Sequence, residues 1–261
     1  MDATRIQLDV LGTLVALSGP TAIVDRVRHA WQPFPEHAGT PAHSYEFAAG
    51  STVRRDGSPI EAEAGVDQIL RFATDLNQLV LAGTSCFAVH SGVVARNGRA
   101  LAFPAASGTG KSTMTAACLR LGWEYVSDEA LLLDFDDGLV RPYPRPLALS
   151  PWSAEAVGLQ VPPGQTELLA TAADLGAEVC TDRPALTDVV LLTRGKVASA
   201  SLSPRHSAEA VQTLLSMSFN HYRWPADSVS MVGRVAQDVR VHVLLYDDPL
   251  AGAAALDDLP S

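Results

Sequence analysis

The chain has 261 residues, of which 47% are hydrophobic and 18% are charged, and its formal net charge is −10. This length and composition predict a globular protein with a full core, either one large domain or a small domain attached to a larger one. The negative charge argues against a partner such as nucleic acid or an anionic membrane, which would need a basic surface. It does not exclude phosphate ligands, which consecutive backbone N–H groups can hold within an acidic protein.

Cysteine usage and hydropathy indicate a cytoplasmic protein. Cys86, Cys118 and Cys180 lie far apart without C-x-x-C spacing, so neither a disulfide framework nor a zinc site is suggested. No stretch approaches the roughly 18 uninterrupted apolar residues of a membrane span. At the start of the chain, Gln7 and Asp9 interrupt what would be the apolar core of a signal peptide.

The sequence pattern of residues 1–82 predicts a small α/β unit. Residues 6–17 and 43–50 alternate or cluster as strands do, and residues 21–31 carry apolar side chains at helical spacing. A second helix is expected from Gly65 to Leu81, after a polar, turn-rich loop at residues 54–65.

The sequence pattern of residues 83–261 predicts a second, larger domain. Residues 86–105 indicate two strands joined by the Asn97-Gly98 turn, followed by a glycine-rich loop and a helix over residues 111–122. The later expected elements are a strand at 123–135, a poorly readable proline-rich segment at 150–180, a buried strand at 187–195, a helix from Ser203-Pro204 through Phe219, a strand at 240–248 and a helix at 249–259.

The loop PAASGTGKST, residues 104–113, has the residue order of a phosphate-binding loop. Ala105 stands where the strict pattern has its first glycine, and alanine would cost about 1 kcal/mol if that position needed a positive φ. The chain has seventeen arginines but only two lysines, and a chance match of either lysine to G-x-G-K-[ST] has a probability of about one in a thousand. The residues expected to contact phosphate are Ala106, Ser107, Gly108, Thr109, Gly110, Lys111, Ser112 and Thr113.

Such a loop presents backbone N–H groups and a helix N-terminus to phosphate oxygens. The lysine reaches the β and γ phosphates, and the hydroxyl that follows holds Mg²⁺. We therefore expect ATP and Mg²⁺ as cofactors.

Asp128 and Glu129 lie seventeen and eighteen residues after Lys111, at the end of the strand that follows the loop's helix. At that place a carboxylate would reach the metal and the γ-phosphate. Strand alternation would point the two acids to opposite sides unless the backbone turns there. His90 lies on the strand leading to the loop, where a lone histidine is most often a core residue, and the other histidines lack metal-ligand spacing.

His90, the Asn-Gly hairpin, residues 100–133 (ALAFPAASGTGKSTMTAACLRLGWEYVSDEALLL) and RPLALS at 145–150 together resemble the kinase domain of the HPr kinase/phosphorylase family, especially its shorter bacterial offshoots. The resemblance covers residues 86–150 and, more loosely, 186–221. It implies an α/β fold, with a P-loop kinase core of the HPr kinase / phosphoenolpyruvate carboxykinase type and a small N-terminal α/β unit.

The resemblance implies a role for each matching residue. Lys111 would contact the phosphates, Ser112 and Asp128 would hold Mg²⁺, and His90 would lie near the reacting phosphate. Either Asp128 or Glu129 would take the proton of the acceptor hydroxyl. The family's second metal-binding glutamate would fall at Trp152, so either Glu155 substitutes for it from one helical turn later or the contact is absent.

The implied activity is transfer of the γ-phosphoryl group of ATP to a serine hydroxyl of a peptide or small protein. Some relatives phosphorylate a C-terminal serine of ribosomally made peptides, including lasso peptides. Longer members assemble into hexamers, so a homo-oligomer is compatible with the resemblance. Two alternatives stay open: an ATP-binding regulatory module without transfer, and a kinase for a small metabolite.

Overall fold

The computed structural model describes residues 3–48, 52–61 and 66–259. By its internal contacts the chain divides into two compact units, Met1–Thr84 and Ser85–Ser261. The domain boundary expected from the sequence, between residues 82 and 83, lies two residues earlier.

Within the described residues, the first unit has a five-stranded sheet, whose strands follow one another in chain order, and two helices. Phe72 lies at the centre of its core, with ring centroids 5.1, 4.9 and 5.7 Å from those of Trp31, Tyr45 and Phe47. The elements are β1 (Ala3–Val10), β2 (Thr13–Pro20), α1 (Thr21–Ala30), β3 (His43–Phe47), β4 (Val53–Arg55), β5 (Ser58–Pro59) and α2 (Gln68–Gly83).

Two tight hairpins in this unit differ from the sequence expectation. Residues 6–17 belong to both β1 and β2, which are joined by Leu11 and Gly12 at φ 55° and 84°. The expected loop at 54–65 contains a second hairpin, because Asp56-Gly57 joins β4 to β5. Gly65, the expected start of the second helix, lies outside the described residues, as do residues 49–50 of the expected strand.

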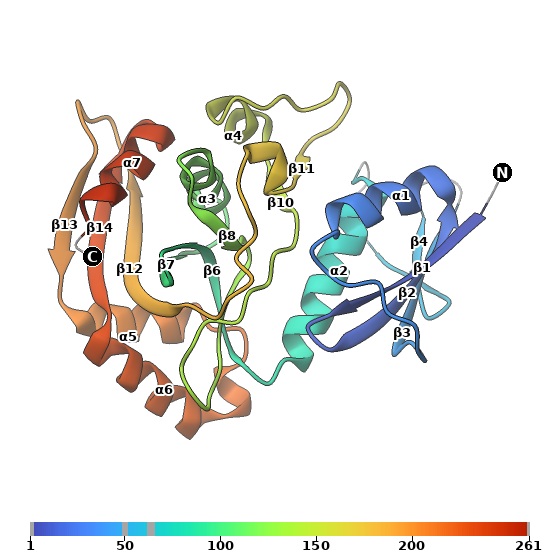
Figure 1. Ribbon diagram of the computed structural model, residues 1–261, viewed down its shortest axis with the longest axis horizontal. Coiled ribbons are helices and arrows are strands. Elements are labelled where there is room, and N and C mark those ends of the chain that lie inside the picture. Colours follow the sequence, from blue (N-terminus) through green and yellow to red (C-terminus); the bar gives the residue numbers. More distant parts are fainter. Residues whose placement is uncertain (1–2, 49–51, 62–65, 260–261) are drawn as a thin grey trace. The chain divides into compact units, whose positions relative to one another are not determined.

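The second unit is built on a seven-stranded mixed sheet in the order β13-β14-β12-β7-β6-β8, with β9 also paired to β6 (Figure 1). Strands β7, β12 and β14 are parallel, so their carboxyl ends meet at one edge of the sheet. Its strands are β6 (Phe87–Arg96), β7 (Arg99–Pro104), β8 (Glu124–Ser127), β9 (Ala130–Leu133), β12 (Ala185–Arg194), β13 (Ser201–Arg205) and β14 (Arg240–Tyr246). A smaller two-stranded sheet pairs β10 (Leu147–Leu149) with β11 (Leu168–Ala170).

Helices cover both faces of the large sheet, which makes the unit a three-layer α/β structure (Figure 1). Both faces need cover because successive side chains of β7 point to opposite faces of the sheet. Leu101 and Phe103 pack into one buried cluster, and Ala100 and Ala102 pack into another. The first cluster includes side chains of α3 (Lys111–Arg120), α4 (Pro151–Ala156) and α7 (Pro249–Ala255), and the second includes side chains of α5 (Ser207–Ser216) and α6 (Pro225–Asp238).

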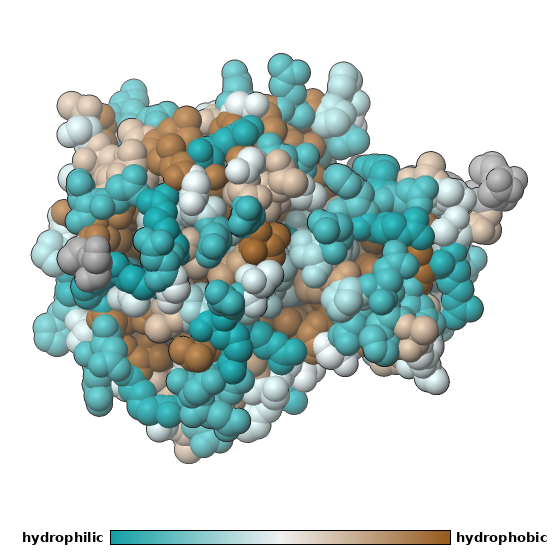
Figure 2. Space-filling view, viewed as in Figure 1, coloured by the Kyte–Doolittle hydropathy of each residue, from teal (hydrophilic) through white to brown (hydrophobic). Residues whose placement is uncertain are grey.

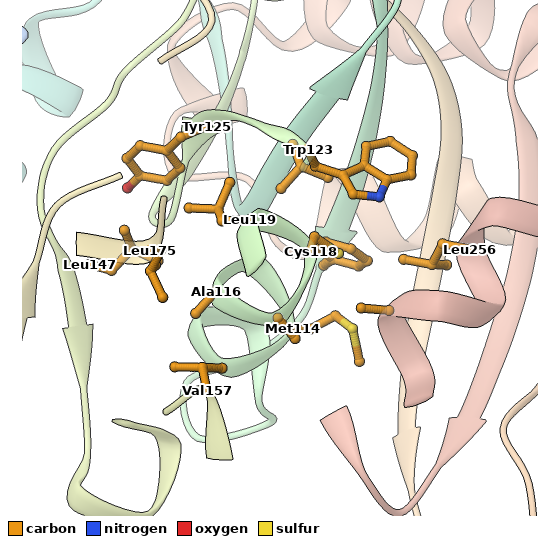
Figure 3. Close-up of a cluster of buried hydrophobic side chains, with 14 of the residues drawn as sticks. Met114, Ala116, Cys118, Leu119, Trp123, Tyr125, Leu147, Val157, Leu175 and Leu256 are labelled. Atoms are coloured by element: carbon orange, nitrogen blue, oxygen red, sulfur yellow. The ribbon is translucent and has the colours of Figure 1, made fainter. Parts of the chain in front are cut away.

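Helix α3 is buried nearly all round, which explains its weakly amphipathic sequence. Met114, Cys118 and Leu119 are at most 1% exposed, and Figure 3 shows these side chains with Val157 and Leu256 in the cluster around the helix. Where α3 crosses β6, a Cβ on Gly92 would stand 2.4 Å from the hydroxyl of Thr115. Glycine at this position therefore lets the helix approach the sheet closely.

The expected Asn97-Gly98 hairpin is confirmed, with φ 54° and 74° at the two turn residues. The expected helix start at Ser203-Pro204 is wrong, because both residues lie in β13, which pairs with β14 at the edge of the sheet. Proline is tolerated on an edge strand because its missing N–H is not needed by a neighbour. Helix α5 starts after His206, and α6 was not expected.

Segment 150–180 is more ordered than its sequence suggests. It contains α4, strand β11 and a short 3-10 helix at Ala173–Leu175. Within residues 3–48, 52–61 and 66–259, no helix has the length and apolar content that crossing a membrane requires.

Candidate active site

The glycine-rich loop connects the carboxyl end of β7 to the first residue of α3. Gly108 and Gly110 have φ 80° and 99°, a region that side chains with a Cβ rarely adopt. A Cβ on Gly110 would also stand 2.9 Å from the hydroxyl of Tyr246. Ala105 does not have a positive φ, so the strain considered for an alanine at that position does not arise.

Lys111 begins α3 and folds back over the loop. Its Nζ donates to the carbonyl of Ala106 at 3.0 Å, and the Thr109 hydroxyl donates to the same carbonyl at 2.7 Å. Lys111 is only 5% exposed, and burial lowers its pKa while the charges of Asp128 and Glu129 oppose that shift. The lysine is thus held at the helix N-terminus, where an anion is favoured.

The backbone bends at Asp128 and Glu129, between the end of β8 and the start of β9. The Ser127 hydroxyl supports the bend by accepting hydrogen bonds from the N–H groups of Glu129 and Ala130, at 3.3 and 3.1 Å. The bend interrupts strand alternation, so both carboxylates line the cavity that the glycine-rich loop also lines.

Asp128 is only 3% exposed. Burial raises its pKa to about 7, and the nearby charge of Glu129 adds to the rise. Arg145, a hydrogen bond with the Ser112 side chain and Lys111 act in the opposite direction. Its Oδ1 is buried and has no hydrogen-bond partner among the described residues. Asp128 therefore has an unused acceptor beside the Ser112 hydroxyl.

The Glu129 carboxylate lies between the imidazole of His90 and the guanidinium of Arg145. Its Oε1 is 3.6 Å from Nε2 of His90, and its Oε2 is 3.4 Å from a terminal guanidinium nitrogen of Arg145. Burial lowers the pKa of His90, as do the charges of Lys111 and Arg145, whereas Glu129 raises it. His90 is thus a half-buried residue of the cavity wall and not a core histidine.

Arg145 is a site residue that the sequence does not single out: Arg141, Arg145, Arg194 and Arg223 can each be considered for a contact to phosphate or substrate, and a solvated surface position is expected for most of them. The side chain of Arg145 is only 10% exposed. The available signal was its position between Pro144 and Pro146, directly before the apolar residues 147–149.

A cavity of about 670 Å³ at the carboxyl edge of the sheet joins these groups. Trp152 of α4 lines the cavity and is 43% exposed. The guanidinium of Arg194 stacks over its ring, 3.9 Å from the ring centroid. Figure 2 shows a largely hydrophilic face, in which hydrophobic residues surface in small separate groups. The cavity is lined by His90, residues 107–113, Asp128, Glu129, Arg145, Ala148, Ser150, Trp152, Ser153, Glu167, Leu192, Arg194 and Tyr246.

Two expected residues are placed differently. The Thr113 hydroxyl is buried against that of Ser153 at 2.8 Å, which ties α3 to α4. Glu155 is exposed and does not line the cavity, whereas Glu167 does. Within the described part of the chain, no group of three or more His, Cys, Asp or Glu side chains is arranged to hold a metal ion.

The chain matches no protein-family model and none of the curated proteins with which it was compared.

Proposed function

We propose that the chain is an ATP-dependent kinase with a P-loop core of the HPr kinase / phosphoenolpyruvate carboxykinase type. One observation carries the proposal. The buried Asp128 lines the same cavity as a loop whose glycines have positive φ and which leads into Lys111. Asp128 has a hydrogen bond with the Ser112 side chain and one carboxylate oxygen without a partner among the described residues. Phosphoryl transfer depends on these elements: N–H groups and a lysine for the phosphates, a hydroxyl and a carboxylate for the metal, and a second carboxylate for the acceptor.

Mg²⁺ suits the oxygen atoms of Ser112 and Asp128. This ion binds through one or two carboxylates together with substrate phosphates, so it does not need a cage of three protein ligands. The unpartnered Oδ1 of Asp128 is an acceptor of the kind that Mg²⁺ uses. When bound, the ion would neutralise charge on the β and γ phosphates.

Glu129 is the better candidate for the proton acceptor. It is 22% exposed at the cavity, whereas Asp128 is almost fully buried and engaged by Ser112. In the proposed step, the acceptor oxygen bonds to the γ-phosphorus while the bond from phosphorus to the β,γ-bridging oxygen breaks. ADP leaves with the electron pair of that bond, and Glu129 takes the hydroxyl proton. Lys111 and the loop N–H groups stabilise the phosphate charge.

The proposed acceptor is a serine hydroxyl of a peptide or small protein in the cytoplasm. The family resemblance supports this acceptor. The first substrates to test are short peptides encoded beside the gene, including precursors of ribosomally made peptides.

The proposal is tested by incubating the protein with γ-labelled ATP, Mg²⁺ and these peptides, and measuring a mass gain of one phosphate. Lys111→Ala should abolish transfer. Lys196→Ala is the matched control, because Lys196 is the only other lysine and is exposed. Glu129→Gln should lower kcat about 10²- to 10⁴-fold while Mg·ADP binding is kept. Asp128→Asn should weaken Mg²⁺-dependent nucleotide binding.

Transfer that survives Lys111→Ala, or Asp128→Asn together with Glu129→Gln, would contradict the mechanism. Nucleotide binding without transfer to any peptide would instead favour an ATP-binding regulatory module. The exposed position of Glu155, outside the cavity, favours that alternative. Transfer to a small hydroxyl compound but to no peptide would favour a metabolite kinase.

A further inference from the structure

We propose that Arg145 binds the γ-phosphate of the nucleotide and makes the site prefer a triphosphate to a diphosphate. This inference rests on the proposed kinase function and adds a residue that the proposed catalytic step does not use.

The first argument is the incomplete pairing of a buried charge. A guanidinium has five N–H donors and keeps its charge in proteins, and burying it is costly unless anions or acceptors satisfy it. The side chain of Arg145 is 10% exposed, and Glu129 is its ion-pair partner at 3.4 Å. That distance exceeds the roughly 2.7–2.9 Å of a good charge-assisted hydrogen bond. Nε is buried and, within the described chain, lacks a hydrogen-bond partner.

The second argument is the rigid backbone that carries Arg145. Its carbonyl accepts a 2.5 Å hydrogen bond from the buried Tyr125 hydroxyl, and its N–H donates to the carbonyl of Tyr143 at 2.9 Å. Pro144 and Pro146 restrict the backbone on either side. An arginine fixed in this way is preorganised for a ligand and loses little freedom on binding.

The third argument is position. Arg145 lines the cavity together with Lys111 and the glycine loop, and its charge acts on His90, Asp128 and Glu129. The loop N–H groups hold the α and β phosphates, and Lys111 reaches the β and γ phosphates from one side of the cavity. Arg145 lies with the carboxylates at which transfer would occur, so the group it meets is the terminal phosphate. The planar fork of arginine suits two oxygens of one phosphate.

A role limited to holding Glu129 in place is the main rival. It predicts that loss of Arg145 affects binding of di- and triphosphates equally. The γ-phosphate contact predicts an effect on the triphosphate alone. The distinction is therefore measurable by binding, without any acceptor.

The test is isothermal titration of the full chain with Mg·ADP and with Mg·AMP-PNP. Arg145→Gln should weaken AMP-PNP binding about tenfold to hundredfold, as expected for loss of a charge-assisted contact, and should leave ADP binding within about threefold. Arg145→Lys should show a smaller loss for AMP-PNP, because the charge stays but the fork is gone. Arg141→Gln, from the same segment but outside the cavity lining, should bind both nucleotides like the parent chain.

Equal effects of Arg145→Gln on both nucleotides, or no effect on either, would overturn the inference and leave the kinase proposal standing. If the parent chain binds neither nucleotide, the proposed function fails and this inference with it. Near-ultraviolet circular dichroism checks that the variant is folded. If Arg145→Gln does not fold, Arg145→Lys decides alone, and unchanged AMP-PNP binding by that variant would overturn the inference.

Discussion

The conformation of the glycine-rich loop depends on Gly110 more than on the missing first glycine. Gly110 has a φ of 99°, and a Cβ added there would stand only 2.9 Å from the hydroxyl of Tyr246. Both features penalise any side chain at this position. Ala105 does not have a positive φ, so its backbone conformation does not require glycine.

We predict that Gly110→Ala lowers Mg·AMP-PNP affinity about fivefold to thirtyfold, because a strain of about 1–2 kcal/mol moves the loop away from the shape proposed to bind phosphate. Titration calorimetry measures the loss. Gly233→Ala, in α6, is the matched control. An added Cβ there meets no atom of the described chain outside its own helix within 4 Å, so this change should stabilise the fold by about 0.5–1 kcal/mol.

Adding Tyr246→Phe to Gly110→Ala separates the two causes. Removing the hydroxyl relieves the contact but leaves the positive φ, so binding should recover only in part. Full recovery would mean that the contact alone makes glycine necessary. Unchanged binding by Gly110→Ala itself would contradict a phosphate role for this part of the loop.

The residues of the loop could be predicted from sequence because their chemistry is local. The order of glycines, Lys111 and Ser112 is legible within ten positions, and the acids at 128 and 129 follow one helix and one strand later. Arg145 could not be predicted in the same way. Its backbone is held by the Tyr125 hydroxyl and the Tyr143 carbonyl, through contacts that composition and spacing do not reveal.

At the scale of the elements, Asp188 joins the starts of three parallel strands. It lies in β12 with its side chain 2% exposed, and it receives bonds from Arg240 of β14 at 2.9 Å and from Arg99 of β7 at 3.2 Å. Burial raises the pKa of Asp188, but hydrogen bonds from Arg240 and Thr187 and the charges of Arg240 and Arg99 lower it below its usual value. This network lies at the sheet edge opposite the candidate site, where β7 and β14 begin.

We predict that Asp188→Asn lowers the free energy of unfolding by about 1–3 kcal/mol at pH 7, since one partner of a buried network is lost. The folded pKa is below the unfolded value of about 3.9. The stabilisation is therefore fully present above that value and is lost as the pH falls through the folded pKa. Urea unfolding at pH 7 and at lower pH should show the difference between parent and variant constant near neutrality and shrinking in acid.

Asp136→Asn is the control, because Asp136 is exposed, and it should change stability by no more than about 0.5 kcal/mol. A difference between the parent and Asp188→Asn that stays constant down to acid pH would show that the carboxylate charge is not what stabilises the three strands.

Elements were predictable where local chemistry determines them. Asn97-Gly98 fixes a two-residue hairpin whatever surrounds it. Leu11-Gly12 forms a similar turn, but leucine at a positive φ gives no such signal. Ser203-Pro204 has the composition of a helix start, yet pairing with β14 makes it an edge strand. The bend at Asp128 depends on the Ser127 hydroxyl and on pairing with β6. From the sequence we could say only that both acids would face the site if the backbone turned there.

At the scale of the whole molecule, each unit has a core of its own. Phe72 and its aromatic neighbours fill the first unit. Two clusters of buried side chains, one on each face of the large sheet, fill the second. All residues that line the candidate site belong to the second unit.

We therefore predict that a fragment comprising residues 85–261 folds alone, as expected of a domain with its own core. It should bind Mg·AMP-PNP within about threefold of the full chain, because the loop, Lys111, Asp128 and Arg145 are all present. Thermal unfolding with and without nucleotide, together with titration calorimetry, measures both properties. The fragment carrying Lys111→Ala is the control and should fold without binding. A wild-type fragment that folds cooperatively but does not bind nucleotide would contradict the assignment of the complete nucleotide site to the second unit.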